Sequence, residues 1–209
     1  EKFTGSKILF GSVTDAYNPY ERKYGVTRSI LKQLQNSDTK IEILTKSNSV
    51  TRDIDILKNM KNLRVGLSIN SLNNSFSRQT EPRAPIAAKR IEALRQLKAA
   101  GIDTYLFMSP IFPRITEWKE IIKIAMPFAN VFYFENLNLR AAYMPRVFKY
   151  ISGNFSHLIP LYEEIYKRKN NGYWEELRSK IEFFCKEQEL NYKFYFYHEK
   201  IKKSGKNTL

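Results

Sequence analysis

The sequence predicts an α/β fold built on a parallel sheet, and three observations favour this class. Short runs of apolar and β-branched residues alternate with longer segments whose apolar residues recur at helical spacing, as in successive strand–helix units. The strand-like runs are apolar at most positions, as strands buried on both faces should be. The chain has 209 residues, of which 43% are hydrophobic and 27% charged, so it is long enough and apolar enough for one sizeable core.

Five runs are expected to form the strands of this sheet. A helical pattern follows each of the first four, which is the arrangement that parallel strands need for their crossovers. The runs are Lys7–Val13, Ile41–Lys46, Leu63–Asn70, Thr104–Ser109 and Asn130–Phe134.

The helix between the third and fourth strands has the strongest pattern. It spans Pro85–Ala100, where the proline suits a first helical turn and Gly101 suits the C-terminal cap. Its apolar stripe consists of Ala87, Ile91, Leu94 and Leu97. The other expected crossover helices are Tyr20–Gln35, Thr51–Met60 and Trp118–Ala125.

The pattern changes after Phe134, where successive helices follow without a strand between them. These helices are Arg146–Ile151, Leu158–Arg168 and Tyr173–Gln188. The last apolar run, Tyr192–Tyr197, fits an edge strand or a helix, and its aromatic side chains suit core packing or stacking on nucleobases. The C-terminal third is therefore expected to be mainly helical.

The composition restricts both the cellular compartment expected for the chain and the disulfide or metal sites that it can form. A single cysteine, Cys185, excludes an intramolecular disulfide and a zinc site built on two or more cysteines. Its position beside Phe184 on an apolar helix face predicts a buried, inert thiol. The chain has no apolar run of the roughly 20 residues that span a bilayer, and its start lacks the order of a signal peptide. We therefore expect a cytoplasmic protein without a membrane partner.

The charge is strongly positive, with 35 Lys and Arg against 21 Asp and Glu and a net charge of +14. Such an excess favours an anionic partner such as nucleic acid or an acidic substrate. The basic residues are spread over every predicted helix, and a solvated lysine-rich surface explains the same count. Both interpretations stay open at this point.

Polar side chains follow the predicted strands at the points where they end. Asp15 follows the first strand, Lys46 ends the second, Ser68 and Asn70 end the third, and the polar segment 135–138 follows the fifth. Because the carboxyl ends of parallel strands meet at one edge, these groups predict a polar ligand site there. The simpler alternative is that strand ends are polar because the chain re-enters water. Neither GxGxxG nor GxxxxGKS occurs, which disfavours a Rossmann dinucleotide site and a P-loop.

Five sequence motifs accompany these strand ends. They read FGSVTDAYNPYERKYGVTRSILKQL, ILTKSNSVTRDIDIL, VGLSINSLN, EPRAPIAAKRIEALRQLKAAGI and FMSPIFPRITEW. In this order, over residues 7–140, they resemble the radical S-adenosylmethionine (radical SAM) family, in the branch related to spore photoproduct lyase. The resemblance implies a partial (β/α)6, TIM-like barrel over residues 1–140 and a mainly helical extension packed on it over 141–209.

The resemblance also implies cofactors and a reaction. The family binds a [4Fe–4S] cluster through CxxxCxxC after its first strand, and the cluster, reduced by an electron donor, cleaves S-adenosylmethionine to a 5′-deoxyadenosyl radical. It places Thr14 and Asp15 at the methionine amino group, Lys46 near the carboxylate, and Ser68 and Asn70 towards the carboxylate or ribose.

The remaining site residues that the resemblance implies come from the last two motifs. Glu81 or Arg83 would complete the shell around the methionine moiety. Phe112 and Pro113 would flank the adenine ring. The catalytic residues and the substrate cannot be named from these motifs, although the branch suggests a DNA lesion as one possibility.

The sequence departs from the family in one respect: it has no CxxxCxxC. It also begins without Met, at the point where the family's second strand is expected, so five of six barrel strands are expected here. We therefore expect a fragment of a radical SAM enzyme that is inactive by itself. The exposed edge of its first strand would favour a dimer. The alternative hypothesis is a cluster-free, basic nucleic-acid-binding module on the same scaffold.

Overall fold

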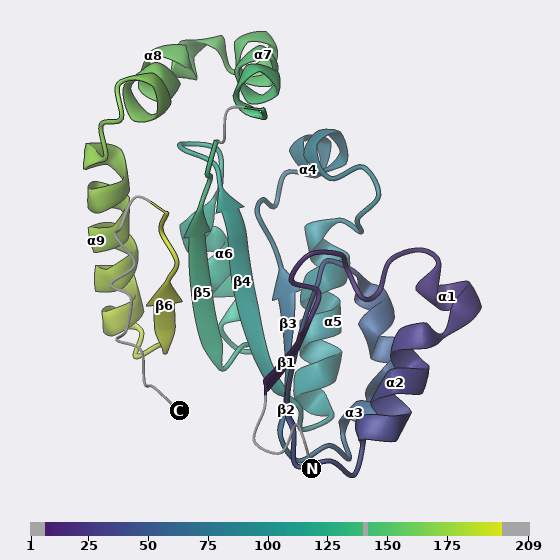
Figure 1. Cartoon of the computed structure of the whole chain (residues 1–209). Coiled ribbons are helices and arrows are strands. Elements are labelled where there is room, and N and C mark those ends of the chain that lie inside the picture. The colour runs from purple at the N-terminus through teal and green to yellow at the C-terminus, as the bar shows by residue number, and fades with distance from the viewer. Residues whose placement is uncertain (1–6, 140–141, 198–209) are drawn as a thin grey trace, which may run out of the picture.

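The parallel sheet is the centre of the molecule. The structure is a computed structural model that describes residues 7–139 and 142–197, and Figure 1 shows the whole chain. Within these residues the sheet has six strands, all parallel, in the order β1-β2-β3-β4-β5-β6. They are β1 (Lys7–Phe10), β2 (Lys40–Thr45), β3 (Leu63–Ser68), β4 (Asp103–Ile111), β5 (Val131–Asn136) and β6 (Tyr192–Phe194).

The strand order has a direct consequence for where the helices lie. When each strand pairs with the next one in sequence and every crossover is right-handed, the crossover helices are placed on the same face of the sheet. Figure 1 shows helix α6 behind β4 and β5, and helix α5 alongside β3. A doubly wound fold would reverse the order part-way, and this sheet does not. The prediction of an α/β fold with a parallel, barrel-like sheet is therefore confirmed.

The helices between the strands match the sequence prediction in part. They are α1 (Glu21–Tyr24), α2 (Val26–Leu34), a 3₁₀ helix (Asn48–Asp53), α3 (Ile54–Leu57), α4 (Asn74–Thr80), α5 (Ala87–Ala99) and α6 (Trp118–Ala125). The single helix predicted over Tyr20–Gln35 was wrong, because Gly25 adopts a left-handed conformation (φ 61°) and divides it into α1 and α2. The helix predicted over Thr51–Met60 starts earlier, as the 3₁₀ helix, and α4 was not predicted.

The C-terminal region is helical, as predicted, but also supplies a strand. Its helices are α7 (Met144–Asn154), a 3₁₀ turn (Ser156–Leu158), α8 (Ile159–Tyr162), a π-helical turn (Glu163–Lys167) and α9 (Gly172–Glu187). The run whose conformation the sequence left open contains β6, and Phe132 of β5 is in register with Tyr192. Residues from both predicted parts of the chain thus form one sheet, while the division at residue 140 stays a prediction.

Two groups of buried apolar side chains hold these elements together. The larger group lies between the sheet and its helices and includes Leu94 and Leu106, and α9 adds Trp174 and Cys185 to it. The smaller group lies beyond the carboxyl ends of β3, β4 and β5, where α7 and α8 cover Phe112 and neighbouring rings. In the described residues, we find no helix with the length and apolar content required to cross a membrane.

Candidate functional site

A cavity of about 660 Å³ opens at the carboxyl ends of β1 and β2. Its walls come from three segments: residues 15–22 after β1, residues 46–49 after β2, and residues 80–85 between α4 and α5. The volume is within the range of small-molecule sites, roughly 300–1,000 Å³. Of the predicted site residues, Asp15, Lys46, Glu81 and Arg83 line this cavity, and its use as a ligand site stays a prediction.

Asp15 joins the first two of these segments. Its Oδ1 accepts hydrogen bonds from the Thr45 hydroxyl at 2.6 Å and the Tyr17 amide at 2.9 Å, and its Oδ2 accepts one from the Lys46 amide at 2.8 Å. A carboxylate oxygen can accept two hydrogen bonds, so Oδ2 retains acceptor capacity on the cavity side. Asp15 thus holds the loop in place and also presents negative charge to the cavity.

Glu81 connects the cavity wall to the protein interior. Its Oε1 is 2.9 Å from the Lys46 Nζ, and its Oε2 accepts a hydrogen bond from Arg90 Nη2 at 2.6 Å. The Arg90 side chain is only 2% exposed, whereas that of Lys46 is 41% exposed. Glu81 therefore pairs with one buried and one accessible cation, and the accessible cation faces the cavity.

Ser68 and Asn70 are placed differently from Asp15 and Lys46. Both are buried, and neither lines the cavity. The Ser68 carbonyl oxygen accepts a hydrogen bond from Arg90 at 2.8 Å, and the Asn70 amide donates one to Glu81 at 3.4 Å. In the structure they support the Glu81–Arg90 pair, and their contact with a ligand stays a prediction.

Three other predicted site residues also lie outside the cavity lining. Thr14 is exposed in the loop after β1. Phe112 packs edge-to-face on Phe76 with ring centroids 5.0 Å apart, and the Pro113 carbonyl accepts a hydrogen bond from Tyr162 at 3.3 Å. The predicted role of Phe112 and Pro113 beside an adenine ring therefore stays a prediction, because both now have partners in the smaller apolar group.

A buried ionic network anchors the loop that follows β1. Asp53 is fully buried, accepts a hydrogen bond from the Tyr17 hydroxyl at 3.0 Å, and pairs with Arg28 and Arg52, each at 2.8 Å. Burial alone would raise the pKa of Asp53, but the hydrogen bonds from Arg52, Arg28 and Tyr17 outweigh it and hold the pKa below its usual range. Burial raises the pKa of Tyr17, and the carboxylate of Asp53 raises it further. The network therefore holds Tyr17, a residue of the cavity wall, in place and keeps Asp53 ionised.

Sequence reasoning missed Arg90 and Asp53. Arg90 occupies the buried face of α5 three residues after Ala87 and four before Leu94, so a charged residue on an apolar helix face was the signal. The corresponding signal for Asp53 was the alternation of arginine and aspartate in TRDID. Arg28 and Asp53 lie 25 residues apart, and Glu81 meets Arg90 only because the loop before α5 folds back on that helix, so the fold shows which partners meet.

The [4Fe–4S] cluster that the sequence resemblance implies does not fit the residues of this chain. Cys185 is fully buried on α9, and burial raises the pKa of its thiol to about 11. The described residues contain no group of three or more His, Cys, Asp and Glu side chains placed to hold a metal ion. The thiolate ligands that a [4Fe–4S] cluster needs are therefore not supplied by these residues.

Comparison with known proteins decides the family. The model of the radical SAM superfamily matches residues 1–125. The chain belongs to the radical SAM superfamily. An uncharacterized protein of Methanocaldococcus jannaschii is 41% identical over 155 residues, which cover 74% of this chain and 58% of that protein. An uncharacterized protein of Acidianus two-tailed virus is 33% identical over 114 residues, covering 54% of this chain and 37% of that protein.

Solved structures of radical SAM enzymes share the fold. Streptococcus suis SuiB superposes with a TM-score of 0.58 at 13% identity, covering 92% of this radical SAM chain and 39% of SuiB. A spore photoproduct lyase mutant gives a TM-score of 0.55 at 17% identity, covering 73% of this chain and 46% of the lyase. At these identities the likeness concerns the fold. The chain spans less than two thirds of the length of the relatives and structures described here.

Proposed function

We propose that the cavity binds S-adenosylmethionine and that this chain is the cofactor-binding part of a radical SAM enzyme. The observation that carries the proposal is the convergence of Asp15, Lys46 and Glu81 on one cavity in a chain of this superfamily. The cofactor's methionine moiety carries an ammonium and a carboxylate group, and the cavity offers an anion and a cation to meet them. One radical SAM neighbour, SuiB, has been solved with S-adenosylmethionine bound.

The two charged groups are assigned separate tasks. Asp15 Oδ2 accepts a hydrogen bond from the ammonium group of the ligand, while the Lys46 ammonium turns from Glu81 towards the ligand carboxylate. Glu81 keeps its charge balanced by Arg90 when Lys46 moves, because the Arg90 contact uses the other carboxylate oxygen. Bound S-adenosylmethionine supplies a 5′-deoxyadenosyl radical precursor in this superfamily, and the residues named here bind and orient it. In this proposal the cluster cysteines and the contact with an electron donor belong to a longer form of the protein.

Titration calorimetry with S-adenosylmethionine tests the proposal. Lys46→Ala is expected to weaken binding about tenfold, since a charge-assisted hydrogen bond is lost. Lys89→Ala is the matched control, because Lys89 is an exposed lysine of α5 that does not line the cavity. If the natural sequence shows no binding, or if the two variants bind equally well, the proposed cofactor site is wrong.

A second candidate function is nucleic-acid binding, with or without cofactor chemistry. Two observations favour it: the net charge of +14, and a structural neighbour at a TM-score of 0.50, a spore photoproduct lyase mutant solved with AdoMet and dinucleoside spore photoproduct. Fluorescence anisotropy of a labelled oligonucleotide tests it, and binding dominated by phosphate contacts should weaken steeply as salt is raised. No anisotropy change at low salt would remove this candidate.

The edge of the sheet suggests how the protein associates. In the described residues β1 pairs with β2 on one side only, and Leu9 of β1 is 44% exposed. We propose a dimer formed through this edge, because an unpaired strand offers backbone hydrogen-bonding groups to a second copy. Sedimentation velocity would show a concentration-dependent dimer that Leu9→Lys weakens; a monomer at all concentrations would contradict it.

A further inference from the structure

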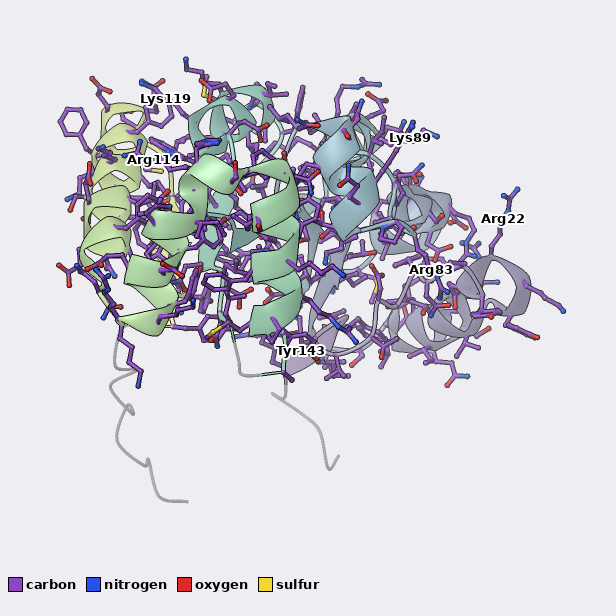
Figure 2. The ribbon with its side chains drawn as sticks, turned by 90° about the horizontal axis from the view of Figure 1, so that it is seen from above. Arg22, Arg83, Lys89, Arg114, Lys119 and Tyr143 are labelled. Atoms are coloured by element: carbon purple, nitrogen blue, oxygen red, sulfur yellow. The ribbon has the colours of Figure 1, made fainter. Side chains whose placement is uncertain are left out.

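Two arginines lie at the mouth of the cavity, and the proposed cofactor contacts do not use them. Arg22 belongs to α1 and Arg83 to the loop that precedes α5, and both line the cavity. Both are exposed to solvent. Figure 2 shows the two residues on the same side of the molecule, at its right-hand edge. The sequence offered Glu81 or Arg83 for the cofactor shell, and the structure places Glu81 inside and Arg83 at the rim.

These two guanidinium groups differ from the other arginines around the cavity. Arg28, Arg52 and Arg90 all pair with carboxylates. In the part of the chain that the structure describes, Arg22 and Arg83 form neither an ion pair nor a hydrogen bond through their side chains. The mouth of the cavity therefore carries positive charge that the protein itself does not balance.

The backbone beneath both arginines is held by buried contacts. At α1, the Glu21 carboxylate is 95% buried and accepts a hydrogen bond from the Thr27 amide at 2.9 Å. In the loop over residues 80–85, Arg90 Nε donates a hydrogen bond to the Pro85 carbonyl at 2.7 Å. Because these contacts hold the backbone on both sides, the two cations need little reorganisation of the backbone to bind one ligand.

We propose that Arg22 and Arg83 form a subsite for a phosphate group of the substrate, at the entrance of the cofactor cavity. The inference rests on the proposed function of the cavity and names the class of substrate, a phosphate ester. A guanidinium group binds phosphate through two parallel hydrogen bonds, and a phosphate has enough oxygens and charge for two such groups. The net charge of +14 also favours a phosphorylated ligand over a neutral one. A mononucleotide and a nucleic-acid strand offer the same group.

Binding of thymidine monophosphate and of a labelled oligothymidylate tests the subsite. Arg22→Ala and Arg83→Ala are each expected to weaken binding about five- to tenfold. Each is also expected to lower the slope of log K against log salt concentration for oligothymidylate by about one. Lys89→Ala is again the matched control, since it removes one exposed positive charge of α5 outside this cavity. Binding of S-adenosylmethionine is measured on the same samples.

The outcomes separate the subsite from the cofactor site. Tighter binding of oligothymidylate than of the mononucleotide, with losses confined to the two arginine variants, identifies a nucleic-acid strand as the source of the phosphate; equal binding identifies a small phosphate ester. The subsite is overturned if both arginine variants behave like Lys89→Ala, or if they weaken S-adenosylmethionine as much as phosphate. Failure of the natural sequence to bind S-adenosylmethionine, with phosphate binding intact, would overturn the proposed function and leave the subsite standing.

Discussion

The carboxylate of Glu81 accepts a hydrogen bond from the buried guanidinium of Arg90 at 2.6 Å. Arg90 also donates to the carbonyl oxygens of Ser68 and Pro85, so it joins the end of β3 to the loop that walls the cavity. A guanidinium that is 2% exposed depends on these partners, because water does not solvate it. The pair therefore supports both the stability of the fold and the position of the cavity wall.

Glu81→Gln is expected to destabilise the protein by about 3–5 kcal/mol, because it leaves the charge of Arg90 buried without its counter-ion. Urea unfolding measures the free energy of unfolding. The matched control is Glu92→Gln on α5, where Glu92 pairs with Arg95 and both side chains are about half exposed. That change should cost less than about 1 kcal/mol. Equal effects of the two substitutions would contradict the structural importance of the Glu81–Arg90 pair.

The elements predicted most accurately are those whose stabilising contacts arise from one continuous segment of sequence. The helix Trp118–Ala125 was predicted with the bounds that α6 has, because its apolar stripe lies within one continuous segment. Helix α4 was missed because NSFSRQT has little apolar periodicity. It is stabilised by the Asn73 cap and by the burial of Phe76 against Phe112, which is distant in sequence.

The same distinction applies to the candidate site. Asp15 and Lys46 lie at strand ends, and the topology of a parallel sheet brings strand ends together whatever the side-chain packing. The pairing of Glu81 with Arg90 could not be predicted, because it depends on how the loop over residues 80–85 folds back on α5. Sequence reasoning thus placed Asp15 and Lys46 at the same edge of the sheet, but could not separate residues that line the cavity from those that support it.

Stability is expected to fall as the pH drops below about 4, and Asp53 is one cause. The pKa of Asp53 is lower in the folded protein than in the unfolded chain, so its contribution is complete above the ordinary aspartate pKa of about 4 and declines as the pH falls through the folded-state value. Urea unfolding between pH 7 and pH 3 measures this decline. Because Asp53 is buried, the decline should persist in high salt.

Asp53→Asn should be less stable at pH 7 and show a flatter pH profile. Asp55→Asn is the matched control, since Asp55 also pairs with Arg28 but its side chain is 58% exposed. A decline in the natural sequence that disappears in high salt would assign the pH dependence to exposed pairs such as Arg28–Asp55. That result would contradict the importance of Asp53 without requiring its variant to fold.

Gly11 is expected to tolerate no side chain. It follows β1 with a φ of 92°, and a Cβ there would lie 1.9 Å from the carbonyl oxygen of Leu44 in β2. Gly11→Ala must therefore separate the first two strands near the cavity, at a cost of more than about 2 kcal/mol.

Gly153→Ala is the control, because a Cβ at that position in α7 meets no atom within 4 Å. It should be neutral or stabilise the protein by up to about 1 kcal/mol. Thermal unfolding of both variants measures the difference, and a stable Gly11→Ala protein would show that β1 and β2 do not pair as described.

Cys185 is expected to react slowly with thiol reagents. Its side chain is fully buried against the helices and sheet, and burial raises its pKa to about 11. Because the thiolate is the reactive species, modification by a disulfide reagent at pH 8 should be at least about 100-fold slower in the native protein than in the unfolded chain. Absorbance of the released thiolate follows the reaction with and without denaturant, and Cys185→Ala gives the background rate. Complete modification of the native protein at the rate of the unfolded chain would mean that α9 separates readily from the core, and would contradict the packing of the C-terminal helices on the sheet.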